Sequence, residues 1–349
     1  MVHYPVIPPY LLERLVQLAP PAVRQSAAQT LRVDMTLRPP SRAVPRVPPA
    51  ATGKAAPQRA IHDAAQGMRL PGILVRAEGA PASTDAAVNE AYDHLGASWQ
   101  LFHDVFNRNS LDDAGMALVA TVHYGEQYDN AFWNGTQMVF GDGDGEVFNR
   151  FTASLDVVAH ELTHGVIDGE GGLTYALQSG ALNESICDVF GSLARQYQLR
   201  QTAAQADWPI GAGLFTSKLQ AKALRSLAAP GTAYDDPLLG KDPQPAHMRD
   251  FVQTTQDNGG VHINSGIPNH AFYLAATALG GFAWERIGQV WYDSLLHPER
   301  RADCDFAQFA QLTGQVAAAM GDDVLAAVRQ GWQGVGLQTG NGAWSAHHV

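Results

Sequence analysis

The feature that most constrains this chain is a predicted interior helix that carries two histidines. Residues 154–168 (SLDVVAHELTHGVID) place His160 and His164 four positions apart, so both imidazoles lie on one helix face. Ser154 is predicted to cap this helix and Gly169 to end it. Its flanks are apolar, and a buried imidazole without a partner is unfavourable. The histidines therefore need partners, and neutral imidazole is a common zinc ligand.

A second predicted helix, residues 178–197, carries a glutamate inside a run that is apolar nearly all round. Glu184 follows His164 by 20 residues, and a buried carboxylate is unfavourable unless it is paired or bound to a metal. Asp188 lies one turn further on and can accept a hydrogen bond from a metal-binding histidine. Two histidines and one glutamate leave a fourth position open, which is typical of catalytic zinc.

Glu161 directly follows the first histidine, in the pattern HELTH. A carboxylate there lies close enough to hold a metal-activated water and to take its proton. The alternative interpretation is an ordinary amphipathic helix with two surface histidines. The apolar flanks and the presence of Glu184 downstream both disfavour that alternative.

Over roughly residues 59–349 the chain resembles the thermolysin family of neutral zinc metallopeptidases. The resemblance rests on five separated stretches: NAFWNGTQMVFGDGDG (130–145), LDVVAHELTHGVID (155–168), SGALNESICDVFG (179–191), ALRSL (223–227) and TQDNGGVHINSGIPNHAFYL (255–274). It implies an α+β zincin fold, with a β-rich N-terminal domain over 59–175, a helical C-terminal domain over 176–349 and the zinc helix between them. It also implies a zinc-dependent endopeptidase that cleaves before hydrophobic residues.

The resemblance assigns further roles to residues outside the two helices. His262 and Tyr175 match donors to the developing oxyanion, and Asp257 matches the carboxylate that orients the histidine. The family also has an arginine that binds a substrate carbonyl, an edge strand that pairs with the peptide, and an apolar pocket for the residue after the scissile bond. The matching positions are, in that order, Arg225; Asn130 and Ala131; and Phe148, Val157, Ile210 and Leu224.

Residues 1–58 differ in composition from the rest of the chain. They carry a net charge of +5, against -16 for the remainder, and hold 11 of the 20 prolines. A short amphipathic helix is predicted over 10–18, followed by an extended linker over 39–57. The segment IPPYLLERL (7–15) is similar to the short pro-segment of protealysin-type precursors, which implies that it docks over the cleft and inhibits until it is cleaved. The alternative is a disordered tail.

Hydrophobic periodicity predicts the other main elements. A helix is expected over 85–106, and strands over 116–124 and 137–140. The C-terminal half is expected to be mostly helical, over 269–279, 284–296, 305–319 and 322–333.

The calcium site that accompanies the family's zinc site is expected to be absent. Asp156 and Asp207 remain acidic at two matching positions. Three other residues stand where the family has glutamates: Arg195, Pro209 and Ala212. Calcium needs about six or more oxygen ligands, and an arginine nearby repels it. Arg195 is instead expected to pair with Asp156 or Asp207, although a weaker site elsewhere stays open.

Composition excludes several other classes of protein. A net charge of -11 opposes nucleic-acid binding, two cysteines cannot form a disulfide framework, and no apolar run suffices to span a bilayer. The N-terminus lacks a Sec-type pattern, so either a cytoplasmic enzyme or export by another route is expected. Two functional alternatives remain: another zincin-type peptidase, such as an aminopeptidase, and a catalytically idle peptide-binding protein.

Overall fold

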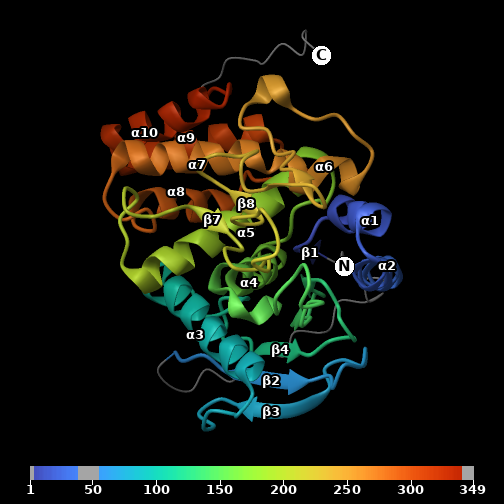
Figure 1. Ribbon diagram of the computed structural model, residues 1–349. Helices are drawn as coiled ribbons and strands as arrows, with labels where there is room; N and C mark the ends of the chain where they lie inside the picture. The colour runs from blue at the N-terminus through green and yellow to red at the C-terminus, as the bar shows by residue number, and fades with distance from the viewer. Residues whose placement is uncertain (1–3, 38–54, 340–349) are drawn as a thin grey trace.

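The computed structural model describes residues 4–37 and 55–339, which form three parts around one helix (Figure 1). A sheet-containing part lies at the bottom of the view and a group of helices lies at the top. The helix α4 (Leu155–Gly169) lies between them, and two N-terminal helices lie at one side. This arrangement confirms the expected α+β architecture with the zinc helix between two parts.

The N-terminal part is built on one six-stranded mixed sheet with the strand order β1-β5-β6-β4-β2-β3. Its strands are β1 (Tyr4–Pro5), β2 (Arg59–Asp63), β3 (Ile73–Ala77), β4 (Leu118–Val122), β5 (Ala131–Trp133) and β6 (Met138–Phe140). The strands β4 and β6 fall inside the two predicted strand segments. Strand β1 comes from the N-terminal segment and pairs antiparallel with β5, so it covers that side of the sheet.

Helix α3 (Ala86–Phe106) confirms the helix predicted over 85–106. The Asp85 carboxylate accepts hydrogen bonds from the backbone N–H groups of Ala87 and Val88, so an acidic cap fixes the start of the helix. The apolar face that defined the pattern is buried: Val88, Tyr92, Leu95, Trp99 and Phe102.

The N-terminal segment forms two helices, of which only the first was predicted. Helix α1 (Pro9–Leu18) buries Leu11, Leu12 and Leu15, whereas Leu18 at its end is 50% exposed. Helix α2 (Pro21–Thr36) follows directly. The predicted linker over 39–57 lies almost entirely outside the described residues.

Helices α4 and α5 (Leu177–Leu199) form the centre of the molecule, and nearly every residue in them is buried. They cross closely at Gly191, where an added Cβ would lie 2.5 Å from the backbone oxygen of Asp156. Ser154 stands at the start of α4, but its hydroxyl donates to the Asp156 carboxylate and caps no backbone N–H. The predicted helix bounds are confirmed, and the predicted side-chain cap is wrong.

The C-terminal part is mainly helical, as expected. Its helices are α6 (Asp257–Asn264), α7 (Gly266–Leu279), α8 (Arg286–Leu295), α9 (Phe306–Met320) and α10 (Asp322–Gly334). Short strands and turns join α5 to these helices: β7 (Pro209–Ile210), β8 (Arg225–Ser226), β9 (Asp235–Asp236), β10 (Gly240–Lys241) and the 3-10 turn Met248–Asp250. Another 3-10 turn, Phe151–Ala153, precedes α4. Trp291 and Trp332 stack with centroids 5.9 Å apart and join α8 to α10 in the core.

Candidate active site

Helices α4 and α5 bring His160, His164 and Glu184 together in the interior, all three with no exposed surface. Nε2 of His160 lies 3.4 Å from one oxygen of Glu184, and Nε2 of His164 lies 3.6 Å from the other. Both Nε2 atoms and one of the glutamate oxygens have no hydrogen-bond partner among the described residues. Converging buried nitrogen and oxygen atoms of this kind fit a zinc ion.

The outer ring nitrogens of both histidines are held by α5. Nδ1 of His160 lies 2.9 Å from an Asp188 oxygen, and Nδ1 of His164 lies 2.8 Å from the side-chain oxygen of Asn183. Hydrogen bonds at Nδ1 leave each Nε2 available as a ligand atom. Asp188 therefore has the position that the sequence predicted for it, and Asn183 is a partner that the sequence reasoning missed.

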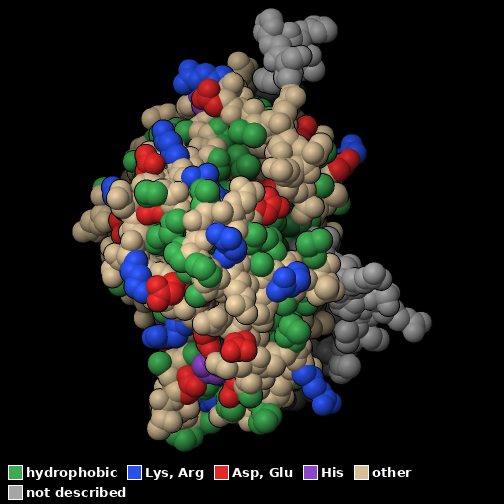
Figure 2. Space-filling model, turned by 45° about the vertical axis from the view of Figure 1, so that its right-hand side comes forward, with side chains coloured by type: hydrophobic (Ala, Val, Ile, Leu, Met, Phe, Trp, Pro, Cys, Tyr) green, Lys and Arg blue, Asp and Glu red, His purple; other side chains and the backbone are tan. Residues whose placement is uncertain are grey.

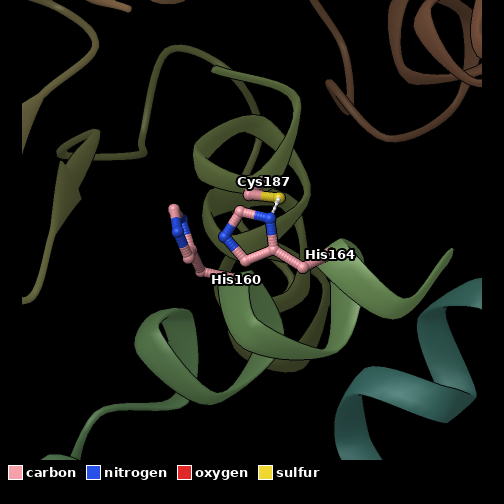
Figure 3. A group of neighbouring side chains, drawn as sticks. All are labelled: His160, His164 and Cys187. Atoms are coloured by element: carbon pink, nitrogen blue, oxygen red, sulfur yellow. Dashed lines mark hydrogen bonds between the residues drawn. The ribbon is translucent and has the colours of Figure 1, made fainter. Parts of the chain in front are cut away.

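Cys187 is a second residue whose place was missed, because the sequence suggested only a small buried hydrophobe. Its sulfur lies 3.2 Å from Nδ1 of His164, so His160, His164 and Cys187 form a compact group that could hold a metal (Figure 3). The sulfur lies near Nδ1 of His164, the atom that Asn183 also contacts, whereas the Glu184 oxygens lie near Nε2 of both histidines. Burial and the surrounding carboxylates raise the pKa of the Cys187 thiol, which opposes the thiolate that a metal would require.

Glu161, next to His160 in α4, is fully buried. Burial raises its pKa to about 8, although the nearby His160 opposes that shift. A carboxyl group with a pKa close to neutrality can both accept and release a proton near neutral pH. Neither of its oxygens has a hydrogen-bond partner among the described residues.

Tyr175, His262 and Asp257 lie on the side of the site that α6 forms. The Tyr175 hydroxyl donates to Glu184 and lies 3.4 Å from Nε2 of His262. The Asp257 carboxylate accepts a hydrogen bond from the backbone N–H of His262, at 2.8 Å, and lies 2.7 Å from Nδ1 of the same residue. Burial lowers the pKa of His262, but Asp257 and Glu184 outweigh it and raise the pKa to about 8.

The glycines of the DNGGVH stretch explain how Asp257 reaches back to His262. Asn258, Gly259 and Gly260 have φ values of 51°, 89° and 77°, in the left-handed region that glycine tolerates. A Cβ on Gly260 would also lie 2.9 Å from the Asn264 side chain. Because this turn breaks helical periodicity, the sequence pattern did not predict α6, although the resemblance assigned a role to His262 within it.

Arg225 is buried at the start of β8 and is tied to the zinc helices. Its guanidinium donates two 2.8 Å hydrogen bonds to the Asp188 carboxylate, and Asn269 donates a third. One aspartate thus orients both His160 and Arg225. The positive guanidinium and the hydrogen bonds outweigh burial and lower the pKa of Asp188, which keeps it ionised.

Residues 4–7 of the N-terminal segment, which begin with strand β1, run through this site. The Val6 N–H donates to the Ala131 carbonyl at 2.9 Å, and the Ile7 N–H donates to the Asn130 side chain at 2.9 Å. The Pro5 carbonyl lies 2.8 Å from Nε2 of His262.

The next carbonyls continue the same pattern. Val6 accepts from Arg225 at 3.2 Å, and Ile7 accepts from the Asn130 amide at 3.3 Å. The predicted substrate-binding strand therefore already holds an extended peptide. The predicted pocket residues Phe148, Val157, Ile210 and Leu224 are all buried.

The positions that match the family's calcium site contain an ion pair. Arg195 donates to both oxygens of Asp207, at 2.9 and 3.2 Å, so the second of its two expected partners is the one observed. Asp156 is buried and accepts from the Ser154 hydroxyl, and burial raises its pKa. Pro209 starts strand β7, and Ala212 follows that strand.

Two surface properties accompany this site. Among the residues the structure describes, no helix is long and apolar enough to cross a membrane. On the face in Figure 2, basic and acidic side chains are interspersed among the coloured residues, without a continuous basic patch.

Two facing helices with a His, His, Glu cluster and a glutamate beside it define a metallopeptidase of the zincin class. Sequence profiles place it more closely: residues 63–168 match the thermolysin metallopeptidase catalytic domain, and residues 171–337 match the thermolysin metallopeptidase alpha-helical domain. The chain belongs to the thermolysin metallopeptidase family.

Individual relatives support the same assignment. An extracellular metalloprotease of Pectobacterium carotovorum subsp. carotovorum is 54% identical over 338 residues, which cover 95% of this chain and 96% of the relative. Protease PrtS of a Photorhabdus species is 54% identical over 283 residues, 80% of this chain and 76% of the relative. The solved structure of the protealysin precursor from Serratia proteamaculans is similar, with a TM-score of 0.89, 53% identity and coverage of 95% of this chain and 99% of that one.

Family membership makes this chain a zinc metalloendopeptidase, a hydrolase of peptide bonds. Its similarity to a precursor structure over nearly the whole length supports a zymogen. The aminopeptidase and idle-protein alternatives are not favoured.

Proposed function

We propose that this site hydrolyses peptide bonds and that each of its residues has a distinct role. His160, His164 and Glu184 hold the zinc ion, and Asp188 and Asn183 fix the two imidazoles through their outer nitrogens. Zinc, when bound, polarises the scissile carbonyl and lowers the pKa of the attacking water. The unpartnered Nε2 atoms and the close glutamate oxygens support this ligand set over one that includes Cys187.

Glu161 accepts the proton of the attacking water and passes it to the leaving amine. His262 and Tyr175 donate hydrogen bonds to the developing oxyanion, and Asp257 orients His262. Arg225 binds the carbonyl that follows the scissile bond, and Asn130 and Ala131 bind the peptide backbone by β-augmentation. The observation that carries the proposal is the segment 4–7, whose backbone already makes these contacts.

The pro-segment inhibits the enzyme because it occupies the place along β5 that an extended peptide substrate would take. Its β1 pairs with β5, and the carbonyls of Pro5 and Val6 use His262 and Arg225. The charge contrast of +5 against -16 supports docking of a basic segment on an acidic body. Cleavage of the linker then releases the cleft, after which peptides that present an apolar residue to the pocket of Phe148, Val157, Ile210 and Leu224 can bind.

The calcium site is proposed to be absent. A guanidinium occupies the neighbourhood of the remaining carboxylates, and Asp207 is already neutralised by Arg195. The names of the relatives, which include extracellular metalloproteases, support secretion.

The decisive experiment replaces the proposed base. Glu161→Ala should retain zinc, measured by metal analysis, and lose about 10²–10⁴-fold in casein hydrolysis, since general-base catalysis contributes about that much. The precursor variant should also keep its N-terminus when followed by mass spectrometry. Full activity, or loss of the pro-segment at the wild-type rate, would refute the assigned role and self-processing respectively.

A zinc chelator separates the remaining alternatives. Casein digestion that stops with chelator and returns with zinc is expected for an endopeptidase. Release of single N-terminal residues alone would indicate an aminopeptidase, and no hydrolysis by the processed chain would indicate an idle binding protein.

A further inference from the structure

The bound strand provides a reference for the positions of a substrate, and this inference rests on the proposed function of the site. The Pro5 carbonyl lies beside His262, the proposed oxyanion donor, so Pro5 stands where the residue before the scissile bond belongs. Val6, beside Arg225, stands after that bond. Tyr4 therefore occupies the position of the second residue before the scissile bond.

The Tyr4 side chain is enclosed by the catalytic body and is only 4% exposed. Its ring stacks on His164, with centroids 4.5 Å apart and planes at 11°. Tyr175 meets it edge-on, also at 4.5 Å. The slot thus matches a flat aromatic ring, and its walls do not come from the pro-segment.

The phenol reaches a charged acceptor at the end of this slot. The Tyr4 hydroxyl donates to one oxygen of Asp168 at 3.1 Å, in the last turn of α4. The other oxygen of Asp168 accepts from the indole N–H of Trp133 at 2.9 Å, which orients the carboxylate from strand β5. Burial and the nearby carboxylate raise the pKa of Tyr4, so the hydroxyl remains a donor.

We propose that Asp168 is a specificity-determining residue, which selects tyrosine at the second position before the scissile bond. A phenylalanine would fill the aromatic slot but could not form the hydrogen bond that the Tyr4 hydroxyl donates to this carboxylate. Sites built to hydrogen-bond a hydroxyl discriminate strongly against analogues that lack it. Because Asp168, Trp133, His164 and Tyr175 all belong to the catalytic body, the subsite persists when the pro-segment has been removed.

The first test uses the unaltered, zinc-loaded enzyme after processing of the full-length chain. Three fluorogenic peptides differ only at the second position before the cleaved bond, which holds tyrosine, phenylalanine or O-methyltyrosine. We expect kcat/KM to be about tenfold higher for tyrosine than for either analogue, since a hydrogen bond to a charged acceptor is lost. Equal values for all three would overturn the proposal without any variant.

The second test uses Asp168→Asn, which retains an oxygen for the Trp133 indole. The preference for tyrosine over phenylalanine, about tenfold in the unaltered enzyme, should disappear because the charged acceptor is gone. Asp303→Asn, which changes an exposed aspartate paired with Arg301, should keep the tenfold preference. A preference that survives Asp168→Asn would overturn the proposal.

A binding measurement separates failure of this inference from failure of the proposed function. The peptides Tyr-Pro-Val-Ile and Phe-Pro-Val-Ile are compared as competitive inhibitors of the processed enzyme, with the first expected to bind about tenfold tighter. Inhibition by both to the same extent would refute the role of Asp168 alone. Absence of binding and of all peptide cleavage would refute the assigned substrate site itself.

Discussion

The contacts that build the catalytic centre differ in kind from those that hold the pro-segment against it. Within the centre, His160, Asp188 and Arg225 form one buried chain of ionisable side chains. The pro-segment docks through buried apolar side chains, such as Leu11, Leu12 and Leu15, and through hydrogen bonds in which at least one partner is a backbone group or a neutral side chain. Thr30 accepts from the Asp129 backbone, and Arg14 of α1 donates to the carbonyl of Leu238.

This difference indicates that the catalytic centre is a permanent part of the fold, whereas the pro-segment is a removable one. A buried charge that loses its partner is strongly unfavourable, so the catalytic chain resists dissection. Hydrogen bonds to backbone and neutral groups exchange readily for bonds to water, with a net effect of only about 1 kcal/mol each. The hydrogen bonds of the docked pro-segment are therefore individually modest, and the segment can dissociate once the linker is cleaved.

The largest effect is expected from Asp188→Ala in the precursor. The change strands Arg225 in the interior and releases Nδ1 of His160, so stability should fall by about 3–5 kcal/mol and zinc affinity by about 10–100-fold. Urea unfolding and a chelator competition measure the two quantities. Asp323→Ala, which breaks an exposed pair with Arg286, should change both far less. Equal losses in the two variants would remove the distinction between the centre and an ordinary surface pair.

A smaller effect is expected from Asp34→Ala in helix α2. Asp34 accepts hydrogen bonds from the Tyr128 hydroxyl and from the Asn130 amide, the side chain that also binds Ile7. Its loss should weaken docking, so trypsin should remove the pro-segment of the Glu161→Ala precursor about tenfold faster. Glu13→Ala, on an exposed position of α1, is the matched control. Unchanged cleavage would show that α2 contributes nothing specific to the docking.

The smallest effect is expected at His123, which precedes the loop residues Gln127 and Asp129 that hydrogen-bond to α2. Its two nitrogens lie 2.9 Å from Asp142 and 2.8 Å from Asp85. The hydrogen bond to Asp142, aided by Asp85, outweighs burial and raises the pKa of His123 to about 9.

Because this pKa is raised above 6.5, the stabilisation is complete below pH 6.5 and is lost as the pH rises through 9. His123→Gln should therefore lower Tm most near pH 6, and the gap to the unaltered precursor should close above pH 9. Thermal unfolding of both proteins at pH 6, 7.5 and 9.5 measures it. A gap that is constant with pH would contradict the charged contact.

The residues of the candidate site that the sequence singled out on local grounds share one property. His160, His164 and Glu184 lie on long helices, where periodicity fixes the face of each residue and burial makes a polar side chain conspicuous. The roles of His262 and Arg225 came only from the resemblance to the family, since neither residue stands out in its own segment. For each of them the structure provides a buried partner, Asp257 or Asp188.

The parts that could not be predicted depend on contacts between distant segments. Helix α2 lies between proline-rich stretches and has small and polar residues at its buried positions, such as Ser26 and Thr30, so its pattern is weak. The pairing of Tyr4 with Trp133 joins residues far apart in the chain, and no local signal encodes that register. Cys187 looked like an ordinary core residue because its neighbour His164 comes from another helix.

The position of β1 at the side of the sheet has a consequence for the solubility of the processed enzyme. Loss of β1 converts β5 from a paired strand into an edge strand, and an exposed edge is a template for intermolecular aggregation. The uncovered strand spans only Ala131–Trp133, and short edges are one of the ways in which proteins avoid such sheet growth. The same three residues can therefore seat a single extended peptide without recruiting a second enzyme molecule.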